Sequence, residues 1–336
     1  MKELRLPERA LRAAIIGAGD ISRVHAQALS ATGIQLVAVV DHDQTRAQAL
    51  ARTAGAQAWT GTQQMLEQIE VDVVHVCTPH DQHLSVARQA LARSKHVLVE
   101  KPLACDLESA LALATAAQES PGTLGVCFQN RYNPTSVAMA AVLGTGELGA
   151  VRGADATLAW HRGPAYYRAK PWAGIRARAG GGVLINQAIH TLDLLQWLLG
   201  PVTQVAASAS TLRPMGSVDV EDTVSLSLTH TEQIRSVMWA TNTHAFDEPI
   251  AIRVRCEQGT LELRDSTLKV TGPGGVRMVS DAAAPDEIPD YWGVGHRGLI
   301  ADFYTHLKGG QPFWLDADAA LASQRIIDQV YQHAVT

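Results

Sequence analysis

The chain has 336 residues, of which 46% are hydrophobic and 18% charged, and its formal net charge is −5. This length exceeds what one ordinary hydrophobic core supports and predicts two domains. The mildly acidic balance argues against nucleic-acid or anionic-membrane partners, which need a basic surface, and no apolar run reaches transmembrane length.

The first 19 residues carry scattered charges and no continuous apolar stretch, so we expect no secretory signal and a cytoplasmic protein. The four cysteines are widely spaced, and none forms a CxxC pair. Free thiols are therefore predicted, rather than a disulfide framework or a zinc site. The cysteines are Cys77, Cys105, Cys127 and Cys256.

Residues 1–129 alternate short strand-like runs with longer helical patterns. Strands are expected at Arg12–Ile16, Gln35–Val40, Val71–Cys77, His96–Glu100 and Thr123–Phe128, and helices at Ile21–Ala31, His80–Arg93 and Leu107–Glu119. This alternation predicts an α/β domain, a Rossmann-type doubly wound parallel sheet.

From about Asn130 onward, strand-like runs follow one another and are joined by turns. They lie at Val151–Trp160, Gln204–Leu212, Thr223–Leu228, Ser236–Thr241, Ile250–Cys256 and Thr260–Leu263. A run of strands after a run of βα units predicts an α+β second domain over residues 130–336, with a large, mostly antiparallel sheet. Residues 317–333 are predicted to form a closing helix. This helix is a candidate to pack back toward the first domain.

A glycine-containing run, GAGDIS at 17–22, follows the first strand and opens the first helix. Gly17 and Gly19 permit a tight turn and a close approach to a pyrophosphate, which the helix N-terminus attracts. Such a run is weak evidence alone, but the surrounding βαβ pattern strengthens it. The turn residues expected to contact the dinucleotide are Gly17, Gly19, Asp20 and Ile21.

Asp41 ends the second strand, 24 positions after Gly17. A carboxylate there can accept hydrogen bonds from the adenosine ribose and repel a 2′-phosphate. Because His42 follows and no arginine flanks Asp41 directly, NAD is predicted over NADP, with Arg46 as the residue that could reverse this preference. The alternative is that Asp41 caps the next helix.

Two further strand ends carry unusual chemistry, and ligands bind outside the carboxyl ends of such strands. Thr78 and Pro79 end one strand, with His83 in the following helix; Glu100 and Lys101 end the next. Lys101 can donate to a substrate oxygen or take its proton; the alternative is a solvated lysine. Its bond to Pro102 is a candidate cis peptide.

His75, His80 and His83 are conceivable metal ligands, but acidic ligands are few and we predict no metal.

Residues 180–200 place three glycines before an apolar run containing Asn186, His190 and Asp193. At helical spacing these three polar side chains share one face. The sequence of this segment is compatible with two roles for His190, either a buried histidine satisfied by hydrogen bonds or a catalytic histidine.

In combination, GAGDIS, Asp41, the CTP–x3–H block at 77–83, EKP at 100–102 and GGG–x3–N–x3–H–x2–D at 180–193 resemble the glucose–fructose oxidoreductase / inositol dehydrogenase / MocA (Gfo/Idh/MocA) family. The resemblance runs nearly end to end, through the segment at 129–134 and the C-terminal end. It implies an open sheet in the second domain, homodimers or homotetramers, and a sugar, inositol or sugar-derivative substrate whose carbinol carbon exchanges a hydride with the nicotinamide.

The resemblance also implies residue roles. Lys101 and His190 would be the catalytic pair, with Asn186 where many members carry aspartate. Further cofactor contacts are expected from His42, Thr78, Pro79, His83, Glu100, Lys101, Gln129 and Trp172. Substrate contacts are expected from Lys101, Arg131, Tyr132, Asn186, Gln187 and His190.

Asn186 is a departure with physical consequences, because an amide can orient His190 but cannot favour its protonated form as a carboxylate does. Three options follow: His190 works with less help, Lys101 is the main acid–base group, or Asp193 supplies the charge.

The segment before the glycines, from Tyr166 to Arg178, carries four cations and three aromatic residues. We expect Trp172 to cover the nicotinamide. For the cations, pairing with surface carboxylates is preferred over contacts with an anionic substrate.

Three functions remain: an NAD-dependent sugar or polyol dehydrogenase, which we favour, an NAD-requiring glycosidase that oxidises its substrate transiently, and a non-catalytic NAD(P)-binding regulator. Retention of both Lys101 and His190 argues against the last.

Overall fold

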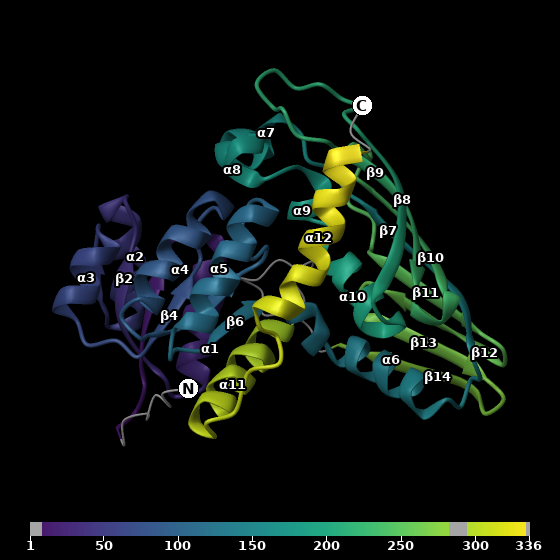
Figure 1. Cartoon of the computed structure of the whole chain (residues 1–336), viewed down its shortest axis with the longest axis horizontal. Helices are drawn as coiled ribbons and strands as arrows, with labels where there is room; N and C mark the ends of the chain where they lie inside the picture. Colours follow the sequence, from purple (N-terminus) through teal and green to yellow (C-terminus); the bar gives the residue numbers. More distant parts are fainter. Residues whose placement is uncertain (1–8, 282–293, 334–336) are drawn as a thin grey trace. The chain divides into compact units, whose positions relative to one another are not determined.

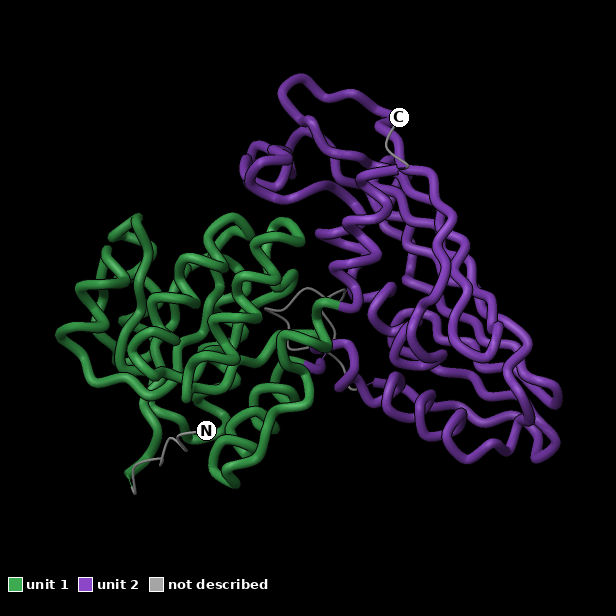
Figure 2. The backbone as a smooth tube through the Cα atoms, in the orientation of Figure 1, with its two compact units in different colours: residues 1–128, 296–321 green, residues 129–295, 322–336 purple. Residues whose placement is uncertain are grey.

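The computed structural model describes residues 9–281 and 294–333. Contacts divide the chain into two compact units (Figure 2). Unit 1 comprises residues 1–128 and 296–321, and unit 2 comprises residues 129–295 and 322–336. The predicted domain boundary between residues 129 and 130 stays a prediction. In the division by contacts, residues 296–321 group with the N-terminal half.

Unit 1 is built on a six-stranded parallel sheet (Figure 1). Its strands are β1 (Arg12–Ile16), β2 (Gln35–Val40), β3 (Gln57–Trp59), β4 (Val73–Val76), β5 (His96–Glu100) and β6 (Leu124–Cys127). Its helices are α1 (Asp20–Ala31), α2 (Gln44–Ala54), α3 (Thr62–Gln68), α4 (His83–Leu91), α5 (Leu107–Glu119) and α11 (Gly295–Lys308). The strand order β3-β2-β1-β4-β5-β6 is that of a Rossmann fold, which confirms the predicted class.

Two features of unit 1 differ from the expected elements. The single helix expected at His80–Arg93 is a 3-10 turn, η1 (His80–Gln82), followed by α4. The expected list also omitted α2, β3 and α3. Helix α2 buries only Ala47 and Ala51, so its apolar stripe is too thin to register as a hydrophobic pattern.

Helix α11 and the segment after it complete the core of unit 1. The rings of Phe303 and Phe313 are buried and approach Gly125 of β6 so closely that an added Cβ there would lie 2.8–2.9 Å from them. The backbone N–H of Val126 donates to the carbonyl of Leu315 at 2.8 Å. Residues from the C-terminal part of the chain thus cover the edge strand β6.

Unit 2 is built on an eight-stranded sheet in the order β14-β13-β12-β11-β7-β10-β9-β8. The strands are β7 (Val151–Ala159), β8 (Val202–Ser210), β9 (Thr223–His230), β10 (Arg235–Thr241), β11 (Ala251–Cys256), β12 (Gly259–Arg264), β13 (Thr267–Gly272) and β14 (Gly275–Ser280). Only the β7–β10 pair among these is parallel, so the predicted mostly antiparallel sheet is confirmed.

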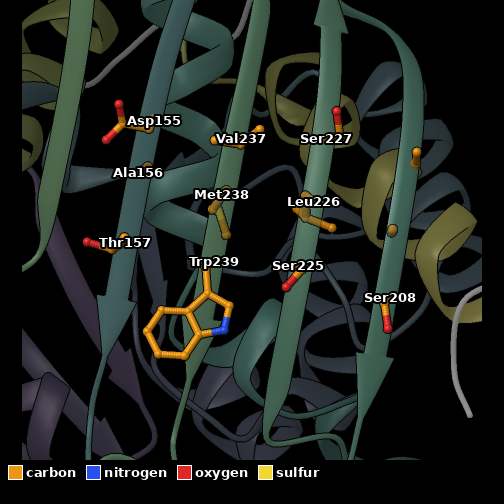
Figure 3. Close-up of a pocket in the computed structure, with 12 residues that line it drawn as sticks. Asp155, Ala156, Thr157, Ser208, Ser225, Leu226, Ser227, Val237, Met238 and Trp239 are labelled. Atoms are coloured by element: carbon orange, nitrogen blue, oxygen red, sulfur yellow. The ribbon is translucent and has the colours of Figure 1, made fainter.

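Helices cover one face of this sheet. They are α6 (Pro134–Thr145), α9 (Val183–Asn186), α10 (Ile189–Leu199) and much of α12 (Ala317–His333). The strands alternate buried and exposed residues, as expected when the second face is solvated. Figure 3 shows part of that second face, where small side chains surround Val237 and Trp239, which are 52% and 40% exposed.

None of the described helices combines the length and apolarity that crossing a membrane requires.

Candidate active-site residues in the two units

The turn after β1 has the shape that a pyrophosphate requires. Gly17 has φ +97° and a Cβ there would collide with the carbonyl of Cys77, so only glycine fits. A Cβ added at Gly19 would meet no protein atom within 4 Å. Packing within the chain therefore does not demand this second glycine, and the open space lies at the N-terminus of α1, where Gly19 is the N-cap. These residues fit a bound dinucleotide phosphate.

Asp41 stabilises this turn from the end of β2. Its Oδ2 accepts the N–H of Ala18 at 2.8 Å, and its Oδ1 accepts the N–H of Asp43 at 2.9 Å. The N-cap of α2 is Asp43, whose Oδ1 accepts two backbone N–H groups, so the alternative of Asp41 as the cap was wrong. Arg46 lies 3.5 Å from Asp43 with its side chain 61% exposed.

The end of β4 carries a buried hydroxyl without a partner in the described structure. No hydrogen bond reaches Thr78 Oγ1, although the atom is buried. Buried polar atoms are normally satisfied by protein, water or ligand. Thr78 therefore fits the predicted cofactor contact.

His83 joins the ends of two strands. Its Nδ1 lies 2.8 Å from the carbonyl oxygen of Pro102 and its Nε2 lies 3.0 Å from that of Thr78. Burial lowers its pKa, although the two carbonyls act in the opposite direction. The structure therefore gives the predicted cofactor ligand His83 backbone partners on both sides.

Lys101 directly follows β5, and its peptide bond to Pro102 is cis. The side chain of the preceding residue, Glu100, is buried and its Oε1 lies 2.9 Å from His25 Nε2. The structure thus places the Glu100 carboxylate against a histidine of α1. That histidine, His296 and Tyr304 were missed by the sequence analysis, which considered His75 only as a possible metal ligand.

In unit 2, the glycines at 180–182 allow close approach by two other segments. A Cβ at Gly181 would collide with the Tyr331 hydroxyl, and one at Gly182 with the backbone of Glu221. The Glu221 carboxylate accepts N–H groups of Gly182 and Leu184, at 2.7 and 3.0 Å, and the Tyr331 hydroxyl at 2.8 Å. The buried carboxylate thereby anchors the start of α9.

The uninterrupted helix expected through Asn186, His190 and Asp193 was wrong. Helix α9 ends at Asn186 and α10 begins at Ile189. Between them the N–H of Ala188 donates to the carbonyl of Val183, a five-residue step that inserts one residue into the helical repeat. The spacing from Asn186 to His190 is therefore not that of an uninterrupted α-helix.

An amide is among the partners of His190. The Nε2 of Gln129 lies 3.3 Å from the Nε2 of His190, within hydrogen-bond reach. Gln129 itself is buried and begins the 3-10 turn η2 (Gln129–Tyr132), which also carries Tyr132.

Asp193 is engaged by Arg131. The guanidinium donates from Nε to Oδ2 at 2.8 Å and from its terminal nitrogen to Oδ1 at 2.6 Å, and both side chains are nearly buried. Burial raises the pKa of Asp193 more than Arg131 lowers it. Because the guanidinium fork occupies both carboxylate oxygens, this geometry disfavours the option that Asp193 supplies charge to His190.

Gln187, a predicted substrate ligand, lies in a network of polar side chains. It donates to the Tyr166 hydroxyl at 3.2 Å and accepts from Asn242 Nδ2 at 3.2 Å. The Oδ1 of Asn242 is buried and makes no hydrogen bond within the described residues. Sequence analysis missed Asn242, because an asparagine after a strand of the second domain carries no distinguishing signal.

The cationic segment is helical, not a loop. It forms α7 (Pro164–Ala169), a 3-10 turn η3 (Pro171–Gly174) and α8 (Arg176–Ala179). The Arg176 guanidinium lies over the ring of Tyr331 at 4.7 Å, so stacking, and not a surface carboxylate, holds this cation. Trp172 is half-buried on η3, and its predicted cofactor contact stays a prediction.

A parallel sheet in Rossmann order, a glycine turn fitted to a pyrophosphate and a second unit carrying a histidine on a glycine-anchored helix define a class: oxidoreductases that bind a nicotinamide dinucleotide. Family models agree. Residues 11–128 match the Gfo/Idh/MocA oxidoreductase family with its NAD-binding Rossmann fold, and residues 137–262 match the Gfo/Idh/MocA C-terminal domain. The chain belongs to the Gfo/Idh/MocA family, and NAD is its cofactor.

Relatives span most of the chain. An uncharacterized oxidoreductase of Synechocystis sp. is 30% identical over 77% of this chain and 73% of its own length. The 1,5-anhydro-D-fructose reductase of Ensifer adhaerens is 28% identical over 89% of each chain. The WlbA dehydrogenase of Bordetella pertussis, solved with NADH and UDP-GlcNAcA, has a TM-score of 0.84, 27% identity and 97% coverage of both chains.

Proposed function

We propose that this protein is an NAD-dependent dehydrogenase that transfers a hydride between the nicotinamide and a carbinol carbon of a sugar, polyol or sugar derivative. One observation carries this beyond family membership: the Gln129 amide lies 3.3 Å from Nε2 of His190, while the Asp193 carboxylate is held by Arg131. An imidazole is suited to accept and return a proton near neutral pH.

In the proposed reaction, bound NAD⁺ supplies the hydride acceptor. Lys101 and His190 serve the substrate hydroxyl: one takes its proton while the other holds the oxygen by a hydrogen bond. Lys101 is fixed by the end of β5 and the His83 bridge to Pro102. His190 is held by Gln129 and by α10. Asn186 orients and contributes no charge.

The proposed cofactor contacts are those of the turn and strand ends. Gly17 and Gly19 leave room for the pyrophosphate, and Thr78 Oγ1 offers an unsatisfied hydroxyl. Asp41 discriminates against the 2′-phosphate of NADP by charge. The exposed Arg46, already beside Asp43, is not placed to reverse that preference.

The substrate class rests on the relatives. One is named for the reduction of an anhydro sugar, and another was solved with a sugar nucleotide. In this chain the amides of Gln187 and Asn242 and the hydroxyl of Tyr166 offer the donors and acceptors that sugar hydroxyls need. We propose Gln187, Arg131 and Tyr132 as substrate-side residues on the same basis.

A screen of NAD⁺ reduction over inositols, aldoses, anhydro sugars, uronates and sugar nucleotides tests the proposal, with NADP⁺ as the parallel cofactor. We expect NADH formation with at least one compound and a fall in kcat/KM of about 10³-fold in K101M. Retained turnover in K101M would remove Lys101 from the reaction. Release of an aglycone without net NADH would support the glycosidase alternative, and NAD binding without turnover the regulator.

We also propose a cytoplasmic homodimer or homotetramer in which a second copy covers the solvated sheet face of unit 2. That face exposes Val237 and Trp239 among small side chains, a surface that permits close packing of a second sheet. Light scattering of V237E/W239E should show a smaller particle than the parent protein. An unchanged mass would exclude this face as the contact.

A further inference from the structure

Unit 1 contains a buried chain of ionisable side chains that directly adjoins Lys101 but is not part of the proposed reaction. At its centre is Glu100, whose Oε1 lies 2.9 Å from His25 Nε2 and 3.6 Å from His296 Nε2. His25 is fully buried and belongs to α1, the helix that begins at the dinucleotide turn. The carboxylate therefore links α1 and α11 to the end of β5.

The other side of His25 is fixed by a second histidine. Its Nδ1 lies 2.8 Å from His75 Nδ1, and His75 Nε2 lies 2.9 Å from the Tyr304 hydroxyl. Two ring nitrogens at this distance share one proton. Burial and the charge on His25 lower the pKa of His75 far below its usual range, so His75 is neutral and accepts that proton from His25.

Glu100 is the anion that balances His25. Burial opposes charge on His25, yet its pKa is raised well above the usual range. Burial raises the pKa of both Cys77 and Cys127, to about 12 for Cys127, so both are neutral thiols, and the Glu100 carboxylate is the neighbouring charge that holds the proton on His25. Burial likewise opposes charge on Glu100, but His25 and His296 hold its pKa well below the usual range.

The alternative role for this cluster is to bind a metal ion. His25, Glu100 and Cys127 each bring one potential ligand atom within 4.8 Å of the others. The 2.9 Å between His25 Nε2 and Glu100 Oε1 is a hydrogen-bond distance. Neighbouring ligand atoms of a tetrahedral zinc site lie about 3.3 Å apart. The geometry therefore favours an ion pair.

We propose that His25 and Glu100 are positioning residues for Lys101: the ion pair fixes the end of β5 and cancels the carboxylate charge one residue from the lysine. This rests on the proposed function, in which Lys101 exchanges a proton. An uncancelled anion at that place would favour the ammonium form of Lys101 and reduce its capacity to act as a base.

The other described groups around the His25–Glu100 pair do not supply a positive charge in place of His25. From α4, His83 is buried with a lowered pKa, and from α11, His296 is buried with a lowered pKa. From the ends of β4 and β6, Cys77 and Cys127 are thiols. Among these described neighbours, His25 is the cation.

The test is the pH dependence of Lys101 acetylation, measured by mass spectrometry on the full chain without substrate, with the half-exposed Lys269 of unit 2 as internal reference. H25Q leaves the carboxylate with an amide donor but no cation. We expect the acetylation midpoint of Lys101 to rise by about one pH unit. E100Q removes the anion, and burial then removes the proton of His25 as well, so the midpoint should stay close to that of the parent.

The combined variant H25Q/E100Q replaces the neutral ion pair with a neutral amide pair. Its midpoint should return to that of the parent, whereas a merely structural role predicts that the two perturbations add. H96Q is the matched control, because His96 is a buried histidine at the opposite end of β5 that accepts the Thr123 N–H. It should reduce stability without moving the Lys101 midpoint.

An unchanged or lowered midpoint in H25Q, or a rise in E100Q as large as that in H25Q, would overturn the proposal. If H25Q does not fold, H25N takes its place, with the same rise expected. Because acetylation needs no substrate, these results do not depend on the dehydrogenase assignment. Loss of turnover in K101M tests that assignment separately.

Discussion

Each unit contains a histidine next to a polar side chain, His25 fully buried and His190 partly buried, and the two neighbouring side chains differ in charge. In unit 1, His25 faces the Glu100 carboxylate at 2.9 Å. In unit 2, His190 faces the Gln129 amide at 3.3 Å, and the carboxylate of Asp193, three residues along α10, is held by Arg131. A carboxylate fixes an imidazole in its charged form, whereas an amide leaves both forms accessible. His25 is therefore suited to keep its proton, whereas His190 is suited to exchange one during the reaction.

The largest effect is expected from H190N. Removing an acid–base group lowers kcat/KM by about 10³-fold, while NADH binding and the unfolding transition stay close to the parent. H230N is the matched control, because His230 is a buried histidine of the same unit bonded to Gly200 and Ser236. Parent-like turnover in H190N would break the contrast between the two histidines.

D193N tests the assignment of the carboxylate in unit 2. It leaves the nearly buried Arg131 guanidinium without its counter-ion, so we expect a loss of about 3 kcal/mol in the free energy of unfolding, measured with denaturant. The double variant R131M/D193L removes both charges and should recover most of the loss. If D193N instead shifts the pH–rate profile at constant stability, Asp193 acts on His190 after all.

The ion pair of unit 1 should appear in the pH dependence of stability. The pKa of His25 is raised above 6.5, so its contribution is complete below pH 6.5 and is lost as pH rises toward the folded-state value. The pKa of Glu100 is lowered below 4.5, so its contribution is complete above pH 4.5 and is lost as pH falls. The stability difference between the parent and H25Q/E100Q should therefore peak between pH 4.5 and 6.5. A flat difference would mean the pair is not ionised.

The smallest effect is expected from N186D, which brings a carboxylate toward the histidine of unit 2. The pKa of His190 should rise by about one unit, and the acid limb of the kcat/KM profile should move to higher pH by the same amount. N186S serves as the uncharged control. An unchanged profile would show that the inserted residue between α9 and α10 keeps position 186 out of reach of the ring.

Local sequence patterns predicted the parts of the molecule that depend on local rules. Gly17, Asp41 and Lys101 lie where a βαβ sequence places them, because strand ends and glycine turns follow from spacing. The five-residue step at Ala188 has no such signature, and the glycines before it are contacted by Glu221 and Tyr331 from far along the chain. The same holds for His25, whose partners come from β4, β5 and α11.

The division of the chain into two units also affects when each core is completed during synthesis. Unit 1 takes Phe303, Tyr304 and Phe313 into its core from residues made after almost all of unit 2. A ribosome that has produced only residues 1–128 has therefore made a sheet whose edge strand β6 still lacks Leu315 beside Val126. The dinucleotide-binding unit begins the chain but completes its core only when residues 296–321 are made, and residues 322–336 then complete unit 2.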